Sequence, residues 1–167
     1  MLIVLEGCDG VGKTTLAHNL ANLLGAEIIH CTTTTPNTEW FFRDIIGMAR
    51  TRNIIADRFC YGQFVYQEPE ERNLTRHALY NLELEMMNAG ARVVYVTCDE
   101  DVLNERLASR NETPMKPIKQ LKQGYLEVFS DSLLNVSVID TTSNAESYVM
   151  PFNKTRAKEI LERGETV

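Results

Sequence analysis

Three glycines and a lysine stand close together near the N-terminus, in residues 7–14, which read GCDGVGKT. This segment fits the pattern G-x-x-x-x-G-K-[ST] at every position. Glycines at this spacing let successive backbone N–H groups turn inward onto phosphate oxygens, and a helix that begins at Lys13 adds the positive end of its dipole. The segment therefore predicts a loop that binds the phosphates of a nucleoside triphosphate. The residues expected to bind it are Gly7, Asp9, Gly10, Val11, Gly12, Lys13, Thr14 and Thr15.

Two side chains of this loop carry its chemistry. Lys13 would bridge the β- and γ-phosphates, and Thr14 would offer its hydroxyl to Mg²⁺. Asp9 is the unusual member, because a carboxylate repels phosphate. The loop follows an apolar run and opens a helical pattern, which is the context that the motif requires.

A second pair of polar residues follows the apolar run 53–56. Asp57 stands at the carboxyl end of a predicted parallel strand beside the phosphate loop, where it could hold the magnesium shell. Arg58 can bind a second phosphate through two guanidinium nitrogens. Such a pair alone is typical of a surface ion pair. Together with the phosphate loop, it predicts a second phosphate-binding site.

Short apolar runs alternate with longer runs of helical periodicity along the whole chain. The predicted strands are 2–6, 27–30, 53–56, 92–97 and 136–140, which are apolar almost throughout, as strands covered on both faces tend to be. Helical patterns lie at 16–24, 74–87 and 118–129. Strand, helix and strand in repetition predict right-handed crossovers. We therefore expect an α/β fold of three layers, in which helices flank a five-stranded parallel sheet.

Composition limits the class of protein. The chain has 167 residues, of which 44% are hydrophobic and 24% charged, an ordinary composition for one globular domain over 1–167. A net charge of −6 leaves no global basic field to attract duplex nucleic acid or an anionic membrane. The four cysteines have no zinc or redox spacing, and the three histidines receive no role. The opening apolar run is too short for a signal peptide or a membrane span, so we expect a cytoplasmic protein with no membrane partner.

The two phosphate motifs together resemble those of the thymidylate kinase-like nucleoside monophosphate kinases. That family carries a loop of the form G-x-[DE]-G-x-G-K-[ST]-T and a segment D-R-[YF]-x-x-S-x-x-x-Y-Q. Residues 7–15 match the first, and the second is matched at the right spacing by Asp57, Arg58, Phe59, Tyr66 and Gln67. The resemblance covers nearly the whole chain, weakly outside the motifs. It implies the P-loop kinase fold.

The resemblance also implies roles on the acceptor side, which would occupy about residues 31–75. Asp9 would reach the 3′-hydroxyl of the acceptor sugar, and Arg58 would bind the 5′-phosphate of the acceptor. Gln63 falls where the family reads the pyrimidine edge. Tyr66 falls where a tyrosine disfavours ribose, and Gln67 completes the motif.

A segment at about 106–118 resembles the lid of this family. Arg106 and Arg110 occupy its R-L-x-x-R positions, where they would cover adenine and neutralise charge on the transferred group. Thr141 lies where such kinases close around the adenine. The expected catalytic residues are therefore Lys13, Arg58, Arg106 and Arg110, and the expected metal ligands are Thr14 and Asp57.

The chain departs from the family pattern on the acceptor side. The stretch between Lys13 and Asp57 is shorter than in cellular thymidylate kinases, HCTTTTPNTEWFFRD replaces an R-E-P-G-type segment, and Gly62 replaces a small hydroxyl residue. This shortened side is similar to that of compact kinases carried by bacteriophages. A phage-encoded enzyme would work in the host cytoplasm. The aromatic residues 40–42 would serve either as core packing or as a wall that stacks on a base.

The expected activity is transfer of the γ-phosphoryl group of ATP, with Mg²⁺, to a pyrimidine deoxynucleoside 5′-monophosphate such as dTMP. One alternative keeps the fold and phosphorylates a deoxynucleoside or a hydroxymethylated pyrimidine, free or in phage DNA. The negative net charge argues against a nucleic acid substrate, although a local basic groove would allow one to bind. A second alternative is a non-catalytic P-loop switch. The helix 74–87 carries two apolar stripes, one at Leu79, Leu82 and Met86 and one at Tyr80, Leu84 and Met87, which predict burial on more than one side. Such a helix would suit either the core or a homodimer.

Overall fold

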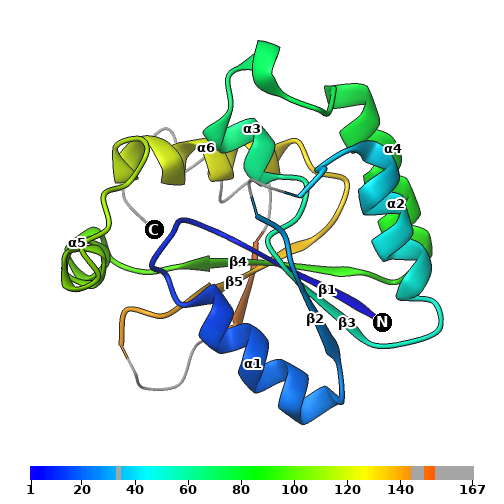
Figure 1. Cartoon of the computed structure of the whole chain (residues 1–167), viewed down its shortest axis with the longest axis horizontal. Coiled ribbons are helices and arrows are strands. Elements are labelled where there is room, and N and C mark those ends of the chain that lie inside the picture. The colour runs from blue at the N-terminus through cyan, green and yellow to red at the C-terminus, as the bar shows by residue number, and fades with distance from the viewer. Residues whose placement is uncertain (33–34, 144–148, 153–167) are drawn as a thin grey trace.

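The computed structural model describes residues 1–32, 35–143 and 149–152 of the chain (Figure 1). Its strands are β1 (Leu2–Glu6), β2 (Glu27–His30), β3 (Ile54–Asp57), β4 (Arg92–Thr97), β5 (Val136–Asp140) and β6 (Val149–Phe152). Its helices are α1 (Lys13–Leu24), α2 (Glu39–Met48), α3 (Gly62–Tyr66), α4 (Arg76–Asn88), α5 (Glu100–Ser109) and α6 (Ile118–Ser130), with a single 3₁₀ turn η1 at Pro69–Glu71.

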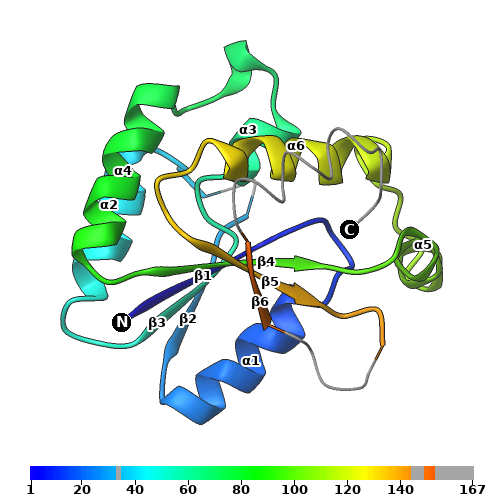
Figure 2. The same ribbon diagram turned by 180° about the vertical axis from the view of Figure 1, so that it is seen from behind.

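The strands form one sheet in the order β2-β3-β1-β4-β5-β6. The first five are parallel, and β6 pairs antiparallel with β5. Helix α1 covers one face, and α2, α3, α4 and α6 lie over the other (Figures 1 and 2). The predicted three-layer α/β fold with five parallel strands is confirmed, and β6 is an addition that the sequence did not indicate.

Register brings the carboxyl ends of the strands together. Leu5 lies opposite Asp57, and Asp57 lies opposite His30 on its other side. Strand β1 is flanked by β3 and β4, and the strand order reverses there, because the chain leaves β1 toward β2 and later returns past it to β4. In open α/β sheets, ligands bind outside the strand ends at such a reversal.

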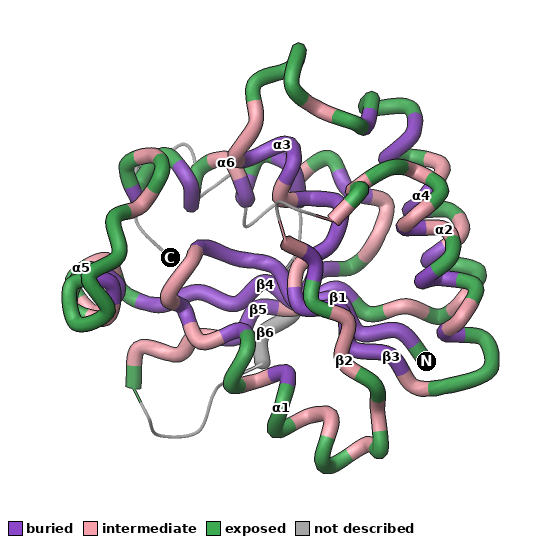
Figure 3. The backbone as a smooth tube through the Cα atoms, in the orientation of Figure 1, coloured by how far each residue is buried: buried purple, intermediate pink, exposed green. Residues whose placement is uncertain are grey.

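The core follows the apolar patterns of the sequence. Every residue of β1 and β3 is buried, because these strands have neighbours on both sides and helices on both faces (Figure 3). The predicted stripe on α6 is buried as well, at Ile118, Leu121, Tyr125, Leu126 and Phe129. Thr38 and Thr75 cap α2 and α4 by accepting hydrogen bonds from backbone N–H groups of the first turn, as threonine does at helix starts.

Helix α4 is buried on one side only. Leu79, Leu82 and Met86 are buried, whereas Tyr80, Leu84 and Met87 are exposed. The second stripe therefore does not enter the core of this chain, and the expectation is wrong as far as burial of both stripes in the core is concerned. No helix in the described ranges combines the length and the apolar character needed to cross a membrane.

The aromatic residues of α2 divide between core and surface. Phe42 is buried and packs edge-on against Phe59, with ring centroids 4.6 Å apart. Trp40 is exposed, with the guanidinium of Arg43 5.5 Å from its ring centroid. Core packing is thus the role of Phe42, and neither Phe42 nor Trp40 lines a cavity described below.

Candidate active site

The loop between β1 and α1 has the backbone geometry of a phosphate cradle. Gly7 adopts φ 144°, and a Cβ atom built on it would lie 2.1 Å from the carbonyl oxygen of Val96. Gly12 precedes α1 with φ 93°, a left-handed conformation that side chains rarely adopt. No side chain of the described residues caps α1, and its first turn holds no acidic residue. The N–H groups at this helix start therefore remain available to an anion.

Lys13 lies folded against its own loop. Its Nζ donates hydrogen bonds to the carbonyl oxygens of Gly7, at 2.8 Å, and Cys8, at 2.7 Å. Burial lowers the pKa of this ammonium below its ordinary value, and the positive charge of Arg58 lowers the pKa further. A phosphate group would supply the negative charge that this buried ammonium needs.

Thr14 and Asp57 meet beneath the loop. The hydroxyl of Thr14 donates to Oδ2 of Asp57 at 2.7 Å, and Nδ1 of His30 lies 2.9 Å from the same oxygen. Because an ionised carboxylate only accepts, Nδ1 of His30 carries the hydrogen. The other oxygen of Asp57 is buried and has no hydrogen-bond partner among the described residues. A hydroxyl and a carboxylate are oxygen ligands of the kind that Mg²⁺ takes, so the predicted pair fits the ion.

His30 is a residue of this site that the sequence analysis did not identify. It is the last residue of β2 and lies opposite Asp57 in the sheet. The only sequence signal for it was its place at the end of a predicted strand. Spacing between histidines carried no information, because the partner of His30 is an aspartate of the neighbouring strand.

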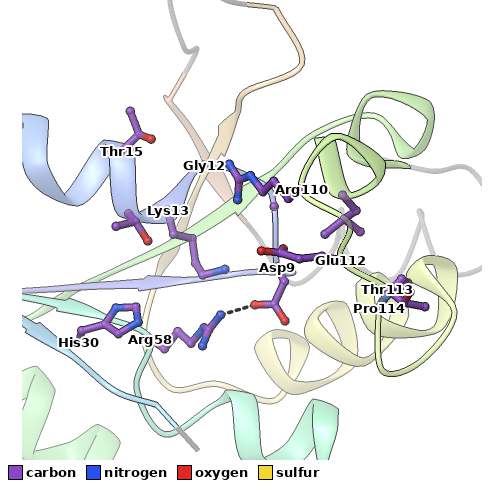
Figure 4. Close-up of a pocket in the computed structure, with 13 residues that line it drawn as sticks. Asp9, Gly12, Lys13, Thr15, His30, Arg58, Arg110, Glu112, Thr113 and Pro114 are labelled. Carbon is purple, nitrogen blue, oxygen red and sulfur yellow. Dashed lines mark hydrogen bonds and ion pairs between the residues drawn. The ribbon is translucent and has the colours of Figure 1, made fainter. Parts of the chain in front are cut away.

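Asp9 and Arg58 form an ion pair at the border of the phosphate loop (Figure 4). The guanidinium of Arg58 donates to Oδ1 of Asp9, and both side chains are partly exposed. Arg58 follows β3 with φ 69°, which is uncommon for a residue with a Cβ atom. Asp9 thus points toward the motif that follows β3, where the carboxylate is balanced by a cation.

Three cavities adjoin in a row along the carboxyl ends of the strands. The central cavity, about 440 Å³, is lined by the phosphate loop, Arg58 and lid residues (Figure 4). The α3 cavity, about 280 Å³, shares Asp9 and Arg58 with the central cavity. The α5 cavity, about 390 Å³, lies on the opposite side and shares Gly10, Gly12, Thr15 and Arg110 with the central cavity. The central cavity therefore connects two sites of ligand size.

The α5 cavity brings the predicted residues Arg106, Arg110 and Thr141 together beside the phosphate loop. Arg106 donates to Oγ1 of Thr141, at 3.1 Å, and to its carbonyl oxygen, at 2.7 Å. The hydroxyl of Thr141 donates to the carbonyl oxygen of Val11 at 2.7 Å. Arg106 is thus bonded to the wall of the α5 cavity at Thr141, whereas Arg110 lines both the α5 and the central cavity.

The α3 cavity holds the predicted acceptor-side residues. Gln63 is buried, and its amide donates to the carbonyl oxygen of Asn37, at 2.7 Å, and accepts from the N–H of Asn73, at 2.9 Å. Within the described ranges, the second N–H of this amide makes no hydrogen bond and is available to a ligand. Burial raises the pKa of the Tyr66 hydroxyl, and the side-chain oxygen of Gln67 is buried without a hydrogen-bond partner in the part of the chain described. All three side chains line the cavity.

The predicted lid spans the cavities. Arg110, Glu112, Thr113 and Pro114 line the central cavity. Met115 lines the α3 cavity, and Nζ of Lys116 donates to the carbonyl oxygen of Val65, at 3.3 Å, and to Glu68, at 3.1 Å. The segment therefore joins the helix that precedes it to the α3 side of the site.

A family model described as thymidylate kinase matches residues 37–150 of the chain. The chain belongs to the thymidylate kinase family. The chain is therefore a nucleotide kinase, a phosphotransferase, and the non-catalytic alternative is set aside. The match includes the α3 side, the lid and the last parallel strands of this thymidylate kinase family member. The phosphate loop lies before the matched residues and is identified by its own motif and geometry.

Solved structures share the fold of this chain. The chain is similar to the YorR protein from Bacillus subtilis in complex with phosphorylated GDP, at 28% identity over 98% of this chain and 95% of that one, with a TM-score of 0.71. Thymidylate kinase from Candida albicans, at 16% identity over 98% and 91%, has a TM-score of 0.52. Deoxyadenosine kinase from M. mycoides with bound dATP, at 18% identity over 98% of both chains, has a TM-score of 0.51. The latter two share the fold. Curated proteins gave no match.

Proposed function

We propose that this kinase transfers the γ-phosphoryl group of ATP, with Mg²⁺, to the 5′-phosphate of a pyrimidine deoxynucleoside monophosphate such as dTMP. The observation that carries the proposal is the place of Arg58, which lines both the central and the α3 cavity. A cation at that border suits the phosphate of a nucleotide whose base and sugar occupy the α3 cavity. The products are ADP and the deoxynucleoside diphosphate.

The donor would lie across the α5 and central cavities. The adenine would occupy the α5 cavity beside Arg106 and Thr141, and the phosphates would run past the start of α1 into the central cavity. Lys13 would exchange the carbonyl oxygens of its own loop for the β- and γ-phosphates. Thr14 and Asp57 would hold Mg²⁺, which neutralises charge on those phosphates when it is bound.

The acceptor would replace Asp9 as the partner of Arg58. With its guanidinium on the acceptor phosphate, Arg58 releases the carboxylate of Asp9, which then accepts a hydrogen bond from the 3′-hydroxyl of the sugar. Tyr66 would pack against the sugar, and the remaining N–H of Gln63 would donate to the base. A carbonyl oxygen on the pyrimidine edge is the matching acceptor for that N–H.

Positioning and charge neutralisation would supply most of the rate. An oxygen of the acceptor phosphate attacks the γ-phosphorus while the bond to the bridging oxygen of ADP breaks, so no side chain has to remove a proton. Lys13, Arg58 and Arg110 surround the central cavity, where the transferred group would lie. The lid residues 112–114 line the same cavity and would exclude water from the transfer.

The test is acceptor-dependent ADP formation from ATP and Mg²⁺, with identification of the product. The panel contains deoxynucleoside and ribonucleoside monophosphates of all bases, deoxynucleosides, and oligonucleotides with hydroxymethylated pyrimidines. Because the YorR structure holds phosphorylated GDP, guanine nucleotides are tested as donor and as acceptor. We expect the highest kcat/KM with dTMP or another pyrimidine deoxynucleotide. The amount of its diphosphate should equal the amount of ADP formed. Phosphorylation of nucleosides or oligonucleotides in preference to monophosphates would overturn the proposal.

A further inference from the structure

Glu6 is a buried carboxylate that none of the roles above uses. It is the last residue of β1, directly before the phosphate loop, and its side chain is fully buried. A buried carboxylate is costly unless its oxygens accept hydrogen bonds. The partners of Glu6 therefore indicate what it holds in place.

Those partners belong to the turn that follows Arg58. One oxygen of Glu6 accepts from the backbone N–H of Phe59, at 2.9 Å, and from that of Tyr61, at 3.2 Å. The other oxygen lies 3.2 Å from the hydroxyl of Tyr125 on α6. That hydroxyl is also 3.2 Å from the carbonyl oxygen of Gly7. A single side chain thus joins the phosphate-loop strand to the turn at 59–61 and to α6.

Arg58 lies between two anchors on β1. The first anchor is the backbone N–H of Arg58, which donates to the carbonyl oxygen of Leu5 at 2.9 Å. The second anchor is the side chain of Glu6, which accepts from the backbone N–H groups of Phe59 and Tyr61. Between the anchors, the backbone of Arg58 has φ 69°, a conformation that surrounding structure must hold for a residue with a Cβ atom. Release of the second anchor would let this backbone relax, and the guanidinium would move with it.

We propose that Glu6 is a positioning residue, which fixes Arg58 at the border of the central and α3 cavities through its hydrogen bonds to the turn at 59–61. The inference rests on the proposed function, in which Arg58 binds the acceptor phosphate. Glu6 does not touch the substrate, so its effect reaches the acceptor only through Arg58. In the proposed function the donor phosphates are bound by the loop and by Lys13, whose hydrogen bonds among the described residues go to Gly7 and Cys8 and not to the turn at 59–61.

The hydrogen bonds, and not the charge, are what the role requires. In Glu6→Gln, the amide oxygen can accept from Phe59 and Tyr61, and the amide N–H can donate to Tyr125, whose hydroxyl then donates to Gly7. Glu6→Met keeps the length and volume of the side chain but removes both acceptor oxygens. Glu6→Asp keeps the charge but places it on a side chain that is shorter by one methylene group. The three variants therefore separate geometry from charge.

The experiment measures dTMP and ATP binding to each variant by calorimetry, together with thermal unfolding. We expect Glu6→Met and Glu6→Asp to bind dTMP about tenfold more weakly, because small displacements of a positioned group cost that much or more. ATP affinity should change by less than about twofold, and Glu6→Gln should match the parent for both ligands within about twofold. Glu6→Met guards against a failure of Glu6→Asp to fold, because it leaves neither a cavity nor a buried charge.

Two comparisons distinguish positioning from a general loss of structure. In an Arg58→Ala background, Glu6→Met should weaken dTMP binding by less than about twofold more, because residues that act through one another are not additive. Glu83→Asp is the matched control. Glu83 is also buried and accepts from the Tyr61 hydroxyl, at 3.0 Å, and from the N–H of Leu133, at 3.0 Å. That variant should lower the unfolding temperature and leave the ratio of dTMP to ATP affinity unchanged.

Equal loss of both ligands in Glu6→Met, full additivity with Arg58→Ala, or a Glu6→Gln variant as weak as Glu6→Met would each overturn the inference. A parent protein that binds ATP but no monophosphate would instead contradict the proposed acceptor. In that case, amide hydrogen exchange at residues 58–61 still tests whether Glu6 anchors the turn. Faster exchange confined to this turn in Glu6→Met supports the anchor, and unchanged exchange contradicts it.

Discussion

The carboxylate of Asp9 accepts a hydrogen bond from the guanidinium of Arg58, so the one acidic side chain of the phosphate loop faces the α3 cavity. The repulsion expected between a carboxylate and bound phosphate is reduced by this arrangement, because Arg58 neutralises Asp9 at the border of the central and α3 cavities, both of which Asp9 lines. In the proposed reaction, each member of the pair changes partner when the acceptor binds, Arg58 for a phosphate and Asp9 for a sugar hydroxyl.

Replacement of Asp9 by Asn should therefore affect the acceptor and spare the donor. We expect the acceptor KM to rise by up to about tenfold, because the amide oxygen of asparagine can still accept from the sugar hydroxyl but no longer makes the stronger, charge-assisted hydrogen bond. ATP affinity should change by less than about twofold, because backbone N–H groups and Lys13 bind the triphosphate. Steady-state kinetics with varied dTMP, and calorimetry with ATP, check both numbers. The exposed Asp44→Asn on α2 is the control, and an unchanged acceptor KM in Asp9→Asn would leave Asp9 without a role.

Lys13→Ala should remove most activity without unfolding the protein. The ammonium lies beside the central cavity, where it would stabilise charge on the transferred group, so we expect kcat to fall about 10²- to 10³-fold. Among the described residues the side chain bonds to carbonyl oxygens of its own loop alone, so the unfolding temperature should shift by only a few degrees, about 1 kcal/mol in stability. Turnover and thermal unfolding measure the two effects. Lys119→Ala, on the exposed side of α6, should match the parent, and near-parent turnover in Lys13→Ala would exclude the loop from catalysis.

Glu6 should make the stability of the protein depend on pH. Burial raises the pKa of its carboxyl group, although hydrogen bonds from Phe59 and Tyr125 and the charge of Lys13 oppose the rise. The folded state then holds this proton more tightly than the unfolded state, whose carboxyl has a pKa of about 4.3. As pH rises from that value through the folded pKa, unfolding releases a proton and the free energy of unfolding falls.

Glu6→Gln should lack this fall. The stability of the variant relative to the parent should grow from about pH 4.3 upward and level off above the folded pKa of Glu6. Urea unfolding of both proteins between about pH 4 and 8 measures the difference. A difference that stays constant across this range, or that shrinks as pH rises, would show that the carboxyl is not held in a raised-pKa environment.

The sheet and the phosphate loop were predictable because their signals are local. Apolar runs located the five parallel strands, and the spacing of glycines located the loop. Strand β6 has no such signal, because it has only four residues and includes Pro151, which cannot donate to a strand ladder. Proline is tolerated there because β6 lies at the edge of the sheet.

The partners of the site residues depend on contacts far apart in the sequence, which no local pattern contains. Gln63 was expected to read a base, and whether it does so stays a prediction. Its two hydrogen bonds, to Asn37 and Asn73, come from loops that only the tertiary fold brings together. The bond between His30 and Asp57 follows from the register of β2 on β3, and the anchoring by Glu6 from the return of β3 beside β1.

His30 leads to a prediction about the metal. Its Nδ1–H holds Oδ2 of Asp57 together with the hydroxyl of Thr14, which fixes how the carboxylate is turned. Second partners of this kind orient metal ligands, and their loss typically weakens metal binding about 10-fold or more. We expect His30→Ala to raise the Mg²⁺ concentration needed for half-maximal activity about tenfold, while kcat at saturating Mg²⁺ stays near that of the parent.

The direct measurement is binding of Mn²⁺, as a spin-active substitute for Mg²⁺, to the complex of the protein with ADP, followed by electron paramagnetic resonance. His30→Ala should bind Mn²⁺ more weakly, whereas His18→Ala, on the exposed side of α1, should bind it like the parent. Thr14→Ala should weaken Mn²⁺ binding as well, because it removes the hydroxyl expected to contact the ion. Parent-like Mn²⁺ affinity in both His30→Ala and Thr14→Ala would place the metal away from Asp57. A lower kcat that saturating Mg²⁺ does not restore would assign His30 a part in the transfer itself. Weaker metal binding caused by a misoriented ligand is overcome by a higher Mg²⁺ concentration, whereas a loss in the transfer step is not.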